Sequence, residues 1–203
     1  MQFRGQRATI KGNGSTGFAA RSRELTIFST SSDKDCRVTD AVSLLESLGP
    51  VLGRIPSGVF ILTAQNSAGC ETGALVSWVQ QASFAPPMVT VAVNRKRYLI
   101  DWLEQSPQVV LNLVGEGQKH FLKHFGAGFG PDEPAFEGLT IHRTAAGLPV
   151  LAEALGVLEG TVRAQLSTGD HVIYAMEITA ARCGAGFPDM KPMVHIRKNG
   201  FNY

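Results

Sequence analysis

The sequence predicts a domain dominated by β-strands, with a barrel or sandwich architecture and few helices. Three observations support this class. Short apolar, β-branched runs recur along the chain between turn residues. Helical spacing of apolar residues is confined to short segments. No GxGxxG motif opens a helix after a predicted strand, and GxxxxGK[ST] does not occur. A closed or layered antiparallel sheet therefore fits better than a doubly wound parallel one.

The expected elements begin at Val38. Apolar residues at near-helical spacing predict a short helix from Val38 to Leu48, which Gly49-Pro50 should end. A second helix is expected over residues 98–105. The residues Ser167-Thr168-Gly169-Asp170 predict a hairpin turn. Buried or half-buried strands are predicted at the apolar runs 58–64, 88–93, 109–114, 158–166 and 172–180.

Residues 1–37 differ in composition from the rest of the chain. Arg4, Arg7, Lys11, Arg21 and Arg23 face one acid, Glu24, before Asp33, among many Ser, Thr and Gly residues. Such a segment offers little apolar surface, so it predicts a disordered extension, a linker or a transit peptide. Residues 38–203 then form one domain. A transit peptide would place the protein in a chloroplast or other plastid; otherwise a cytoplasmic location is expected.

Composition excludes several classes of function. A net charge of +2 is too small to indicate nucleic-acid binding. No apolar run reaches the roughly 18 residues of a membrane span. The three cysteines lack CxxC spacing, which argues against a disulfide framework or a zinc site. His120 and His124 have the i, i+4 spacing of a helical metal pair, but no glutamate lies between them. We therefore expect no metal.

The middle of the chain contains a motif in which a strand of small residues is followed by a Ser-x-x-Pro-Pro segment. A strand of small residues, Gly73-Ala74-Leu75-Val76-Ser77-Trp78, leads to Ser83-Phe84-Ala85-Pro86-Pro87. It resembles the Ser-x-x-Pro-Pro segment of the flavin reductase domain family. Further matches come in that family's order over residues 50–203: Ser57-Gly58-Val59, Val110-Leu111-Asn112-Leu113, Gly147-Leu148-Pro149-Val150-Leu151 and Gly169-Asp170-His171. Lys123-His124-Phe125 and the ending His195 to Tyr203 resemble one branch, the C-terminal domain of flavodiiron proteins of oxygenic phototrophs.

The resemblance implies a fold and a ligand. The fold is the FMN-binding split β-barrel with peripheral helices, which pairs into a homodimer with the flavin near the subunit interface. The cofactor is FMN, with FAD as the alternative. Gly160 stands where the family usually has a cysteine, so no role of that cysteine is expected. The metal-binding core of the flavodiiron proteins is missing from the sequence, so oxygen reduction by this chain alone is not implied.

The chemistry of FMN suggests which residues hold it. A flat apolar ring needs close backbone approach, and a dianionic phosphate needs donors and positive charge. Ala74, Leu75, Val76, Ser77 and Trp78 can lie along the ring, while the Ser83 hydroxyl can donate to ribityl or phosphate oxygens and Pro86 stiffens that loop. The turn after the next strand offers three donors, Asn94, Lys96 and Arg97. The competing interpretations are a core position for Trp78 and a solvated turn for the basic residues.

His171 is the predicted catalytic-site residue. In the family that Gly169-Asp170-His171 resembles, this histidine lies near the flavin and the incoming nucleotide; the alternative is a turn histidine held by Asp170. The leading functional hypothesis is an NAD(P)H:flavin oxidoreductase that transfers hydride from the nicotinamide to the flavin. The second is a non-catalytic, FMN-holding or structural subunit of a larger redox or photosynthetic complex. A pyridoxamine-phosphate oxidase is a third, for which substrate-phosphate arginines are not found.

Overall fold

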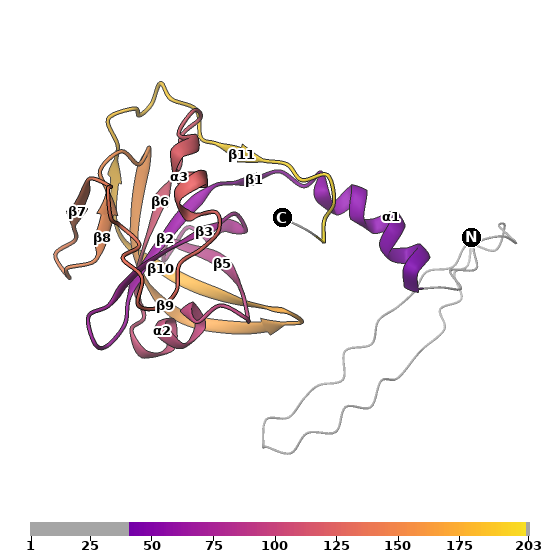
Figure 1. The fold of residues 1–203 in the computed structure, drawn as a ribbon, viewed down its shortest axis with the longest axis horizontal. Coiled ribbons are helices and arrows are strands. Elements are labelled where there is room, and N and C mark those ends of the chain that lie inside the picture. The colour runs from indigo at the N-terminus through magenta and orange to yellow at the C-terminus, as the bar shows by residue number, and fades with distance from the viewer. Residues whose placement is uncertain (1–40, 202–203) are drawn as a thin grey trace, which may run out of the picture. The chain divides into compact units, whose positions relative to one another are not determined.

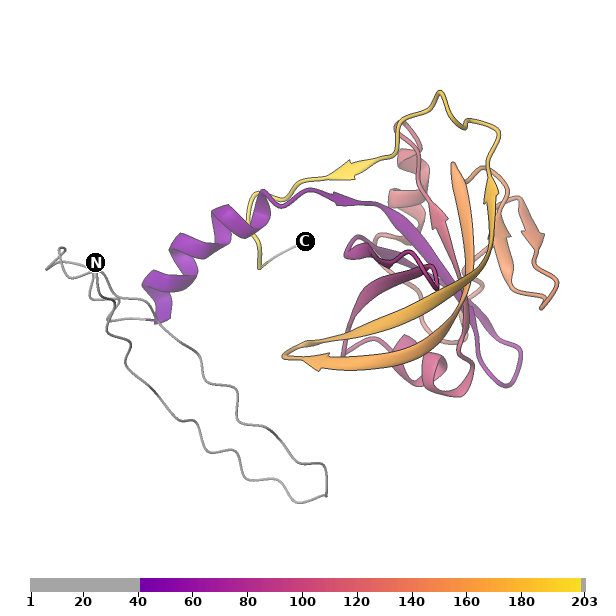
Figure 2. The same ribbon diagram turned by 180° about the vertical axis from the view of Figure 1, so that it is seen from behind.

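The computed structural model describes residues 41–201, so the expectation for residues 1–37 and the predicted helix start at Val38 lie outside the described residues. Three α-helices are present in this part of the chain: α1 (Ala41–Gly53), α2 (Leu99–Gln105) and α3 (Lys119–Phe125). Within it, no helix is long and apolar enough to cross a membrane. Figure 1 shows α2 and α3 against a large sheet, and Figure 2 shows the same arrangement from behind.

Strands dominate the structure, as predicted. The five expected runs are confirmed as β2, β5, β6, β9 and β10, with ends shifted by at most a few residues. The strands in chain order are β1 (Ser57–Gly58), β2 (Phe60–Gln65), β3 (Glu71–Val76), β4 (Val79–Ser83), β5 (Met88–Asn94), β6 (Gln108–Leu113), β7 (Ile141–Arg143), β8 (Pro149–Leu151), β9 (Gly156–Thr168), β10 (His171–Cys183) and β11 (Val194–His195).

Seven strands form one antiparallel sheet in the order β3-β2-β6-β9-β10-β5-β4. Its two edge strands, β3 and β4, are consecutive in the chain and are joined by Ser77 and Trp78 alone. Seven flat strands about 4.8 Å apart would separate the edges by roughly 29 Å. Three Cα steps can span only about 11 Å. The sheet must therefore curl until its edges meet, which makes a barrel that is split between β3 and β4, with Ser77 and Trp78 in the seam.

The core has two parts, because β2 and β6 are buried on both faces. Alternate residues point to opposite sides of a strand. Leu62 and Leu111 pack inside the curled sheet with α2, whereas Ile61 and Val110 pack outside it beneath α3, β7 and β8. Continuous apolar runs without alternation are expected of strands covered on both faces, which explains the pattern of residues 58–64 and 109–114.

Two of the resemblance motifs, 110–113 and 147–151, hold the fold together. Asn112 is fully buried; its side-chain amide donates to the Ile61 carbonyl at 3.0 Å and accepts from the Leu151 N–H at 2.9 Å. Thr63, also fully buried, donates to the Pro149 carbonyl at 2.7 Å. A buried side-chain amide or hydroxyl must find such partners. These bonds fix the β7–β8 ribbon onto β2 and β6, outside the barrel.

The helix α1 continues past Gly49-Pro50, and the C-terminal tail bonds its last carbonyls. Pro50 lies inside the helix, which ends only at Gly53, so the expectation that Gly49-Pro50 would end it is wrong. Proline removes one N–H donor, but the last carbonyls of a helix can be satisfied from elsewhere. Here the backbone N–H of Gly200 donates to the Gly49 carbonyl at 2.7 Å, and that of Arg197 to the Gly53 carbonyl at 2.8 Å. These bonds, and the pairing of β11 with β1, place the tail beside β1 (Figure 1).

We predict opposite effects on stability for the removal of two tyrosine hydroxyls, those of the buried Tyr174 and the half-buried Tyr98. The Tyr174 hydroxyl is buried without a hydrogen-bond partner among the described residues, and burial raises the pKa of this group. The Tyr98 hydroxyl lies 2.6 Å from Thr72 Oγ1 and 3.3 Å from the Gly130 carbonyl. We expect Tyr174→Phe to leave the free energy of unfolding unchanged or raised, and Tyr98→Phe to lower it by about 1 kcal/mol. Denaturant unfolding of both variants checks this; a clear loss for Tyr174→Phe would mean that its hydroxyl is bonded.

Candidate functional site

Two cavities meet at the seam of the barrel. The first, the Ser77 cavity, measures about 270 Å³ and is lined by Val59, Leu75, Ser77, Arg97, Leu122, Gly126 and His195. The second, the Trp78 cavity, measures about 400 Å³ and is lined by Leu52, Ile55, Ser57, Trp78, Asn94, Asp170, His171, Arg197, Gly200 and Phe201. Three short segments contribute to both: the seam link, the β1 segment and the C-terminal tail. The cavities are therefore neighbours.

The Ser77 cavity combines apolar walls with unsatisfied polar groups. Val59, Leu75 and Leu122 supply the walls, from the residue between β1 and β2, from β3 and from α3. Ser77 is only 6% exposed, and its hydroxyl has no hydrogen-bond partner among the described residues. A buried hydroxyl without a partner costs stability, so this one is poised to bond a ligand. The cavity fits a flat, largely apolar molecule with polar edges.

Arg97 supplies positive charge to the same cavity. It lies in the turn between β5 and α2, where the Asn94 side chain accepts from the Lys96 N–H at 3.0 Å and the Asn94 carbonyl accepts from the Arg97 N–H at 3.0 Å. None of the carboxylates in residues 41–201 forms an ion pair with Arg97. A guanidinium without a carboxylate partner beside apolar walls and a free hydroxyl suits an anionic group such as a phosphate.

The Trp78 cavity contains a stack of side chains. The His171 ring centroid lies 4.8 Å from that of Trp78, and Cζ of Arg197 lies 5.1 Å from the Trp78 centroid. Trp78 is half-buried and lines this cavity, so it is not a fully buried core residue, and its predicted contact with the flavin ring stays a prediction. Offset aromatic contacts and a cation over an indole are each favourable. The stack gives this cavity a rigid aromatic wall.

His171 is oriented by its neighbour in the chain. It is 8% exposed, and its Nδ1 lies 2.8 Å from the Asp170 carboxylate. The hydrogen bond from His171 holds the pKa of Asp170 below its ordinary value, so the carboxylate stays ionised at neutral pH. Because a carboxylate only accepts, Nδ1 carries the proton, and Nε2 is the nitrogen left for a ligand. Asp170 therefore holds His171, as the interpretation of a turn histidine predicts. His171 also lines the Trp78 cavity, so its predicted contact with the nucleotide stays a prediction.

The structure groups some of the predicted site residues and separates others. Leu75, Ser77 and Arg97 line the Ser77 cavity, and Trp78, Asn94 and His171 line the Trp78 cavity. The rest line neither cavity: Val76 is in the core, Ala74 packs against it, Lys96 is exposed in its turn, Pro86 is exposed, and Ser83 lines a separate apolar groove with Pro87 and Met88. The last group stays a prediction without a cavity to support it.

Several lining residues could not be found from local patterns. Val59, Leu122 and Gly126 come from three elements and carry no chemistry of their own, so only the folded chain places them together. His195 and Arg197 had a signal in the sequence, because they lie in the tail that resembles flavin reductase domains. The pairing of β11 with β1, Ser57 opposite His195, explains how this tail reaches the cavities.

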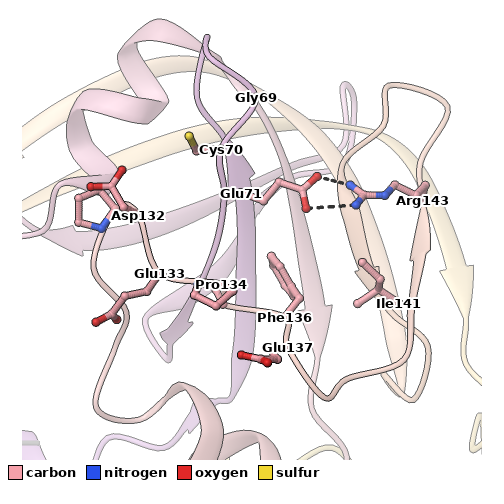
Figure 3. A pocket seen from close by; sticks show the side chains of 12 residues that line it. Gly69, Cys70, Glu71, Asp132, Glu133, Pro134, Phe136, Glu137, Ile141 and Arg143 are labelled. Carbon is pink, nitrogen blue, oxygen red and sulfur yellow. Dashed lines mark hydrogen bonds and ion pairs between the residues drawn. The ribbon is translucent and has the colours of Figure 1, made fainter.

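Another hollow on the surface, about 670 Å³, lies elsewhere and has the wrong charge for a phosphate. Figure 3 shows Glu71 and Arg143 pairing through both carboxylate oxygens, so these two groups neutralise each other. Asp132, Glu133 and Glu137 surround the remaining wall (Figure 3). An excess of carboxylates repels an anionic ligand. We refer to this site as the acidic hollow.

Ser77→Ala tests whether the free hydroxyl faces a ligand. Removing a buried hydroxyl that has no partner should leave the unfolding free energy of the ligand-free protein unchanged or slightly raised. If the hydroxyl bonds a bound flavin, the same change should weaken flavin binding by about 0.5–1.5 kcal/mol. Thermal unfolding with and without FMN measures both effects. A variant that is destabilised without FMN, yet binds it normally, would assign Ser77 to the fold.

The class defined by this fold and site is the split-barrel flavoprotein. A strand-dominated antiparallel sheet curls to a seam, where a cation, a free hydroxyl and apolar walls face one cavity. The chain belongs to the flavin reductase like domain family, whose sequence profile matches residues 52–202. The resemblance read from the Ser-x-x-Pro-Pro segment and the motifs around it is therefore confirmed.

Relatives and solved structures agree with this assignment. Diflavin flavoprotein A 1 of Synechocystis is 36% identical over 169 residues, which cover 82% of this chain and 29% of that protein. The chain thus spans less than a third of this relative's length. Among solved structures, the NADH:FAD oxidoreductase of Streptomyces globisporus superposes with a TM-score of 0.69 at 23% identity, covering 78% of this chain and 92% of that one. The flavin reductase of styrene monooxygenase from Pseudomonas putida gives 0.61 at 24% identity, covering 72% and 91%.

Proposed function

We propose that this chain binds FMN in the Ser77 cavity and reduces it with NAD(P)H, which enters the Trp78 cavity. The observation that carries the proposal is that one apolar-walled cavity is lined by the exposed Arg97 guanidinium, which pairs with no described carboxylate, and by the buried Ser77 hydroxyl, which has no partner among the described residues. Removing a phosphate from water requires charge-assisted donors, and Arg97 can supply them. The cavity measures about 270 Å³, so it would hold only part of either flavin, and FMN would leave less of the ligand outside it than FAD.

The roles of the chain's own residues follow from their positions. Arg97 and Ser77 bind the phosphate and ribityl ends, and Leu75 and Val59 exclude water from the flavin ring. Asp170 holds the His171 ring, whose Nε2 then accepts a hydrogen bond from the carboxamide of the nicotinamide. Trp78 and Arg197 wall the nucleotide's cavity. The bound flavin supplies the hydride-accepting ring, so no protein nucleophile is required.

Oxidation of NADH and NADPH with added FMN tests this function. The purified protein is first titrated with FMN by fluorescence quenching, and nucleotide oxidation is then followed at saturating FMN. Turnover supports the reductase. Binding without turnover supports the alternative, a non-catalytic FMN-holding subunit of a larger redox or photosynthetic complex. Failure to bind FMN or FAD contradicts both.

We also propose that the chain works as a homodimer. Large apolar side chains are exposed near the rim of the Trp78 cavity and on the β4–β5 loop: Val51 is 67% exposed, Ile55 59%, Ile196 53% and Phe84 89%. Exposed large apolar side chains of this kind are typical of an interaction surface. Sedimentation analysis checks the state; a monomer at working concentrations would contradict the proposal. The role of residues 1–37 as a plastid transit peptide or linker stays a further proposal, which import assays can test.

A further inference from the structure

We propose that Gly128 is a positioning residue for Arg97, and that the glycine loop of residues 126–130 sets the affinity of the site for the phosphate of FMN. This inference rests on the proposed function and concerns the loop between α3 and β7. The loop follows α3 directly, and its first residue, Gly126, lines the Ser77 cavity together with Arg97.

The backbone of Gly128 lies against the side chain of Arg97. Gly128 has φ of +81°, and a Cβ built on it would overlap Nη1 of Arg97. The guanidinium therefore lies directly against the Gly128 backbone, in space that only glycine leaves open. Since no ion pair with a described carboxylate fixes Arg97, this backbone surface is the support that the structure provides for its outer end.

The loop itself is fixed on several sides, so it cannot easily give way. The Gly128 N–H donates to the Phe125 carbonyl at 3.1 Å, and Tyr98 bonds the Gly130 carbonyl at 3.3 Å. The Gly130 N–H donates to the Glu133 carboxylate at 2.7 Å. Phe129 packs on Phe125, with ring centroids 5.8 Å apart. Any side chain added at Gly128 should therefore displace the flexible end of Arg97 and leave the loop in place.

Tyr98 links the glycine loop to β3, the strand that leads to the Ser77 cavity. Tyr98 follows Arg97 in the chain, and its hydroxyl joins Thr72 of β3 to Gly130 of the loop. Leu75 and Ser77, which line the cavity, lie at the other end of β3 and in the seam after it. The Tyr98 bonds thus tie the loop to the strand that leads to the cavity, and Gly128 sets where the guanidinium can rest.

Gly128→Ala, measured with FMN and with riboflavin, tests the inference. Riboflavin lacks the phosphate, so its binding reports the rest of the site. We expect Gly128→Ala to weaken FMN by about tenfold, the order of one charge-assisted hydrogen bond, and to leave riboflavin nearly unchanged. The matched control is Gly138→Ala, because Gly138 also has a positive φ, +76°, but a Cβ there meets nothing within 4 Å. Both variants carry the same backbone strain, so a similar loss of thermal stability is expected for both.

A double variant separates positioning from strain. In an Arg97→Ala background, Gly128→Ala should cause no further loss of FMN affinity, because there is no guanidinium left to displace. Equal losses for FMN and riboflavin, an equal effect of Gly138→Ala, or additive losses in the double variant would each overturn the inference. If Arg97→Ala weakens FMN selectively while Gly128→Ala does not, the proposed function stands and this inference fails. If the wild-type protein binds FMN no better than riboflavin, the phosphate site fails and the inference with it.

Discussion

Arg97→Ala should weaken FMN binding by about 1.5–3 kcal/mol, or roughly 10- to 150-fold, while riboflavin binding changes little. Arg97 lines the Ser77 cavity and pairs with no carboxylate of residues 41–201, so its removal should leave the phosphate without charge-assisted donors and break no ion pair in that part of the chain. Fluorescence titration with the two flavins measures the difference. An equal loss for both would assign Arg97 to the architecture of the cavity.

Lys96→Ala is the matched control for this prediction. Lys96 neighbours Arg97 in the same turn, carries the same charge and is also exposed, but it lines neither cavity, so its predicted role in holding the phosphate has no cavity to support it. Removing it changes the net charge by the same amount, so a general electrostatic effect would appear in both variants, weakly and with strong dependence on salt. We expect Lys96→Ala to bind FMN within about twofold of the wild type, as an exposed, screened charge should.

His171→Ala should retain FMN but lower kcat/KM for NAD(P)H by roughly tenfold to a hundredfold, the range for one lost orienting hydrogen bond. The reason is the orientation of the ring: Asp170 occupies Nδ1, which leaves Nε2 to the nucleotide. Steady-state kinetics on the yellow, folded variant give the answer. Unchanged kinetics would remove His171 from the site, and a colourless variant would move it to flavin binding.

Two conservative variants distinguish the ring nitrogens. A glutamine amide reaches about as far as Nε2 of histidine, whereas an asparagine amide reaches only about as far as Nδ1. His171→Gln should therefore restore part of the nucleotide kinetics, and His171→Asn should not. Rescue by asparagine instead would mean that the contact with Asp170, and hence the shape of the hairpin turn, is what matters.

Much of the fold could be predicted because its strands are defined locally. The five predicted runs became β2, β5, β6, β9 and β10, and the turn Ser167 to Asp170 joins the last two as a hairpin. Local sequence patterns did not predict the strands that are short or exposed. β4 is mostly exposed and reads Val-Gln-Gln-Ala-Ser, and β1 and β11 have two residues each and exist only because they pair with each other.

The predicted site residues that line the cavities lie in a few short segments of the sequence. Leu75, Ser77 and Trp78 were predicted from the resemblance and lie in or beside the seam link, and Asn94 and Arg97 were predicted as phosphate donors and lie in the turn after β5; all five line one of the two cavities. Ser83 shows the limit of this approach. It is near Ser77 in sequence, but β4 carries it along the strand to a separate groove. Likewise, the closeness of Gly128 to Arg97 depends on how the loop after α3 folds back, which no local pattern contains.

A structure of the protein with FMN is the most direct test of the account. The phosphate should lie within hydrogen-bond distance of Arg97, the ring should lie along Leu75 and Ser77, and the Trp78 cavity should stay open beside His171. FMN bound in the acidic hollow, or in the groove lined by Ser83, with Arg97 free of the phosphate, would contradict the central claim.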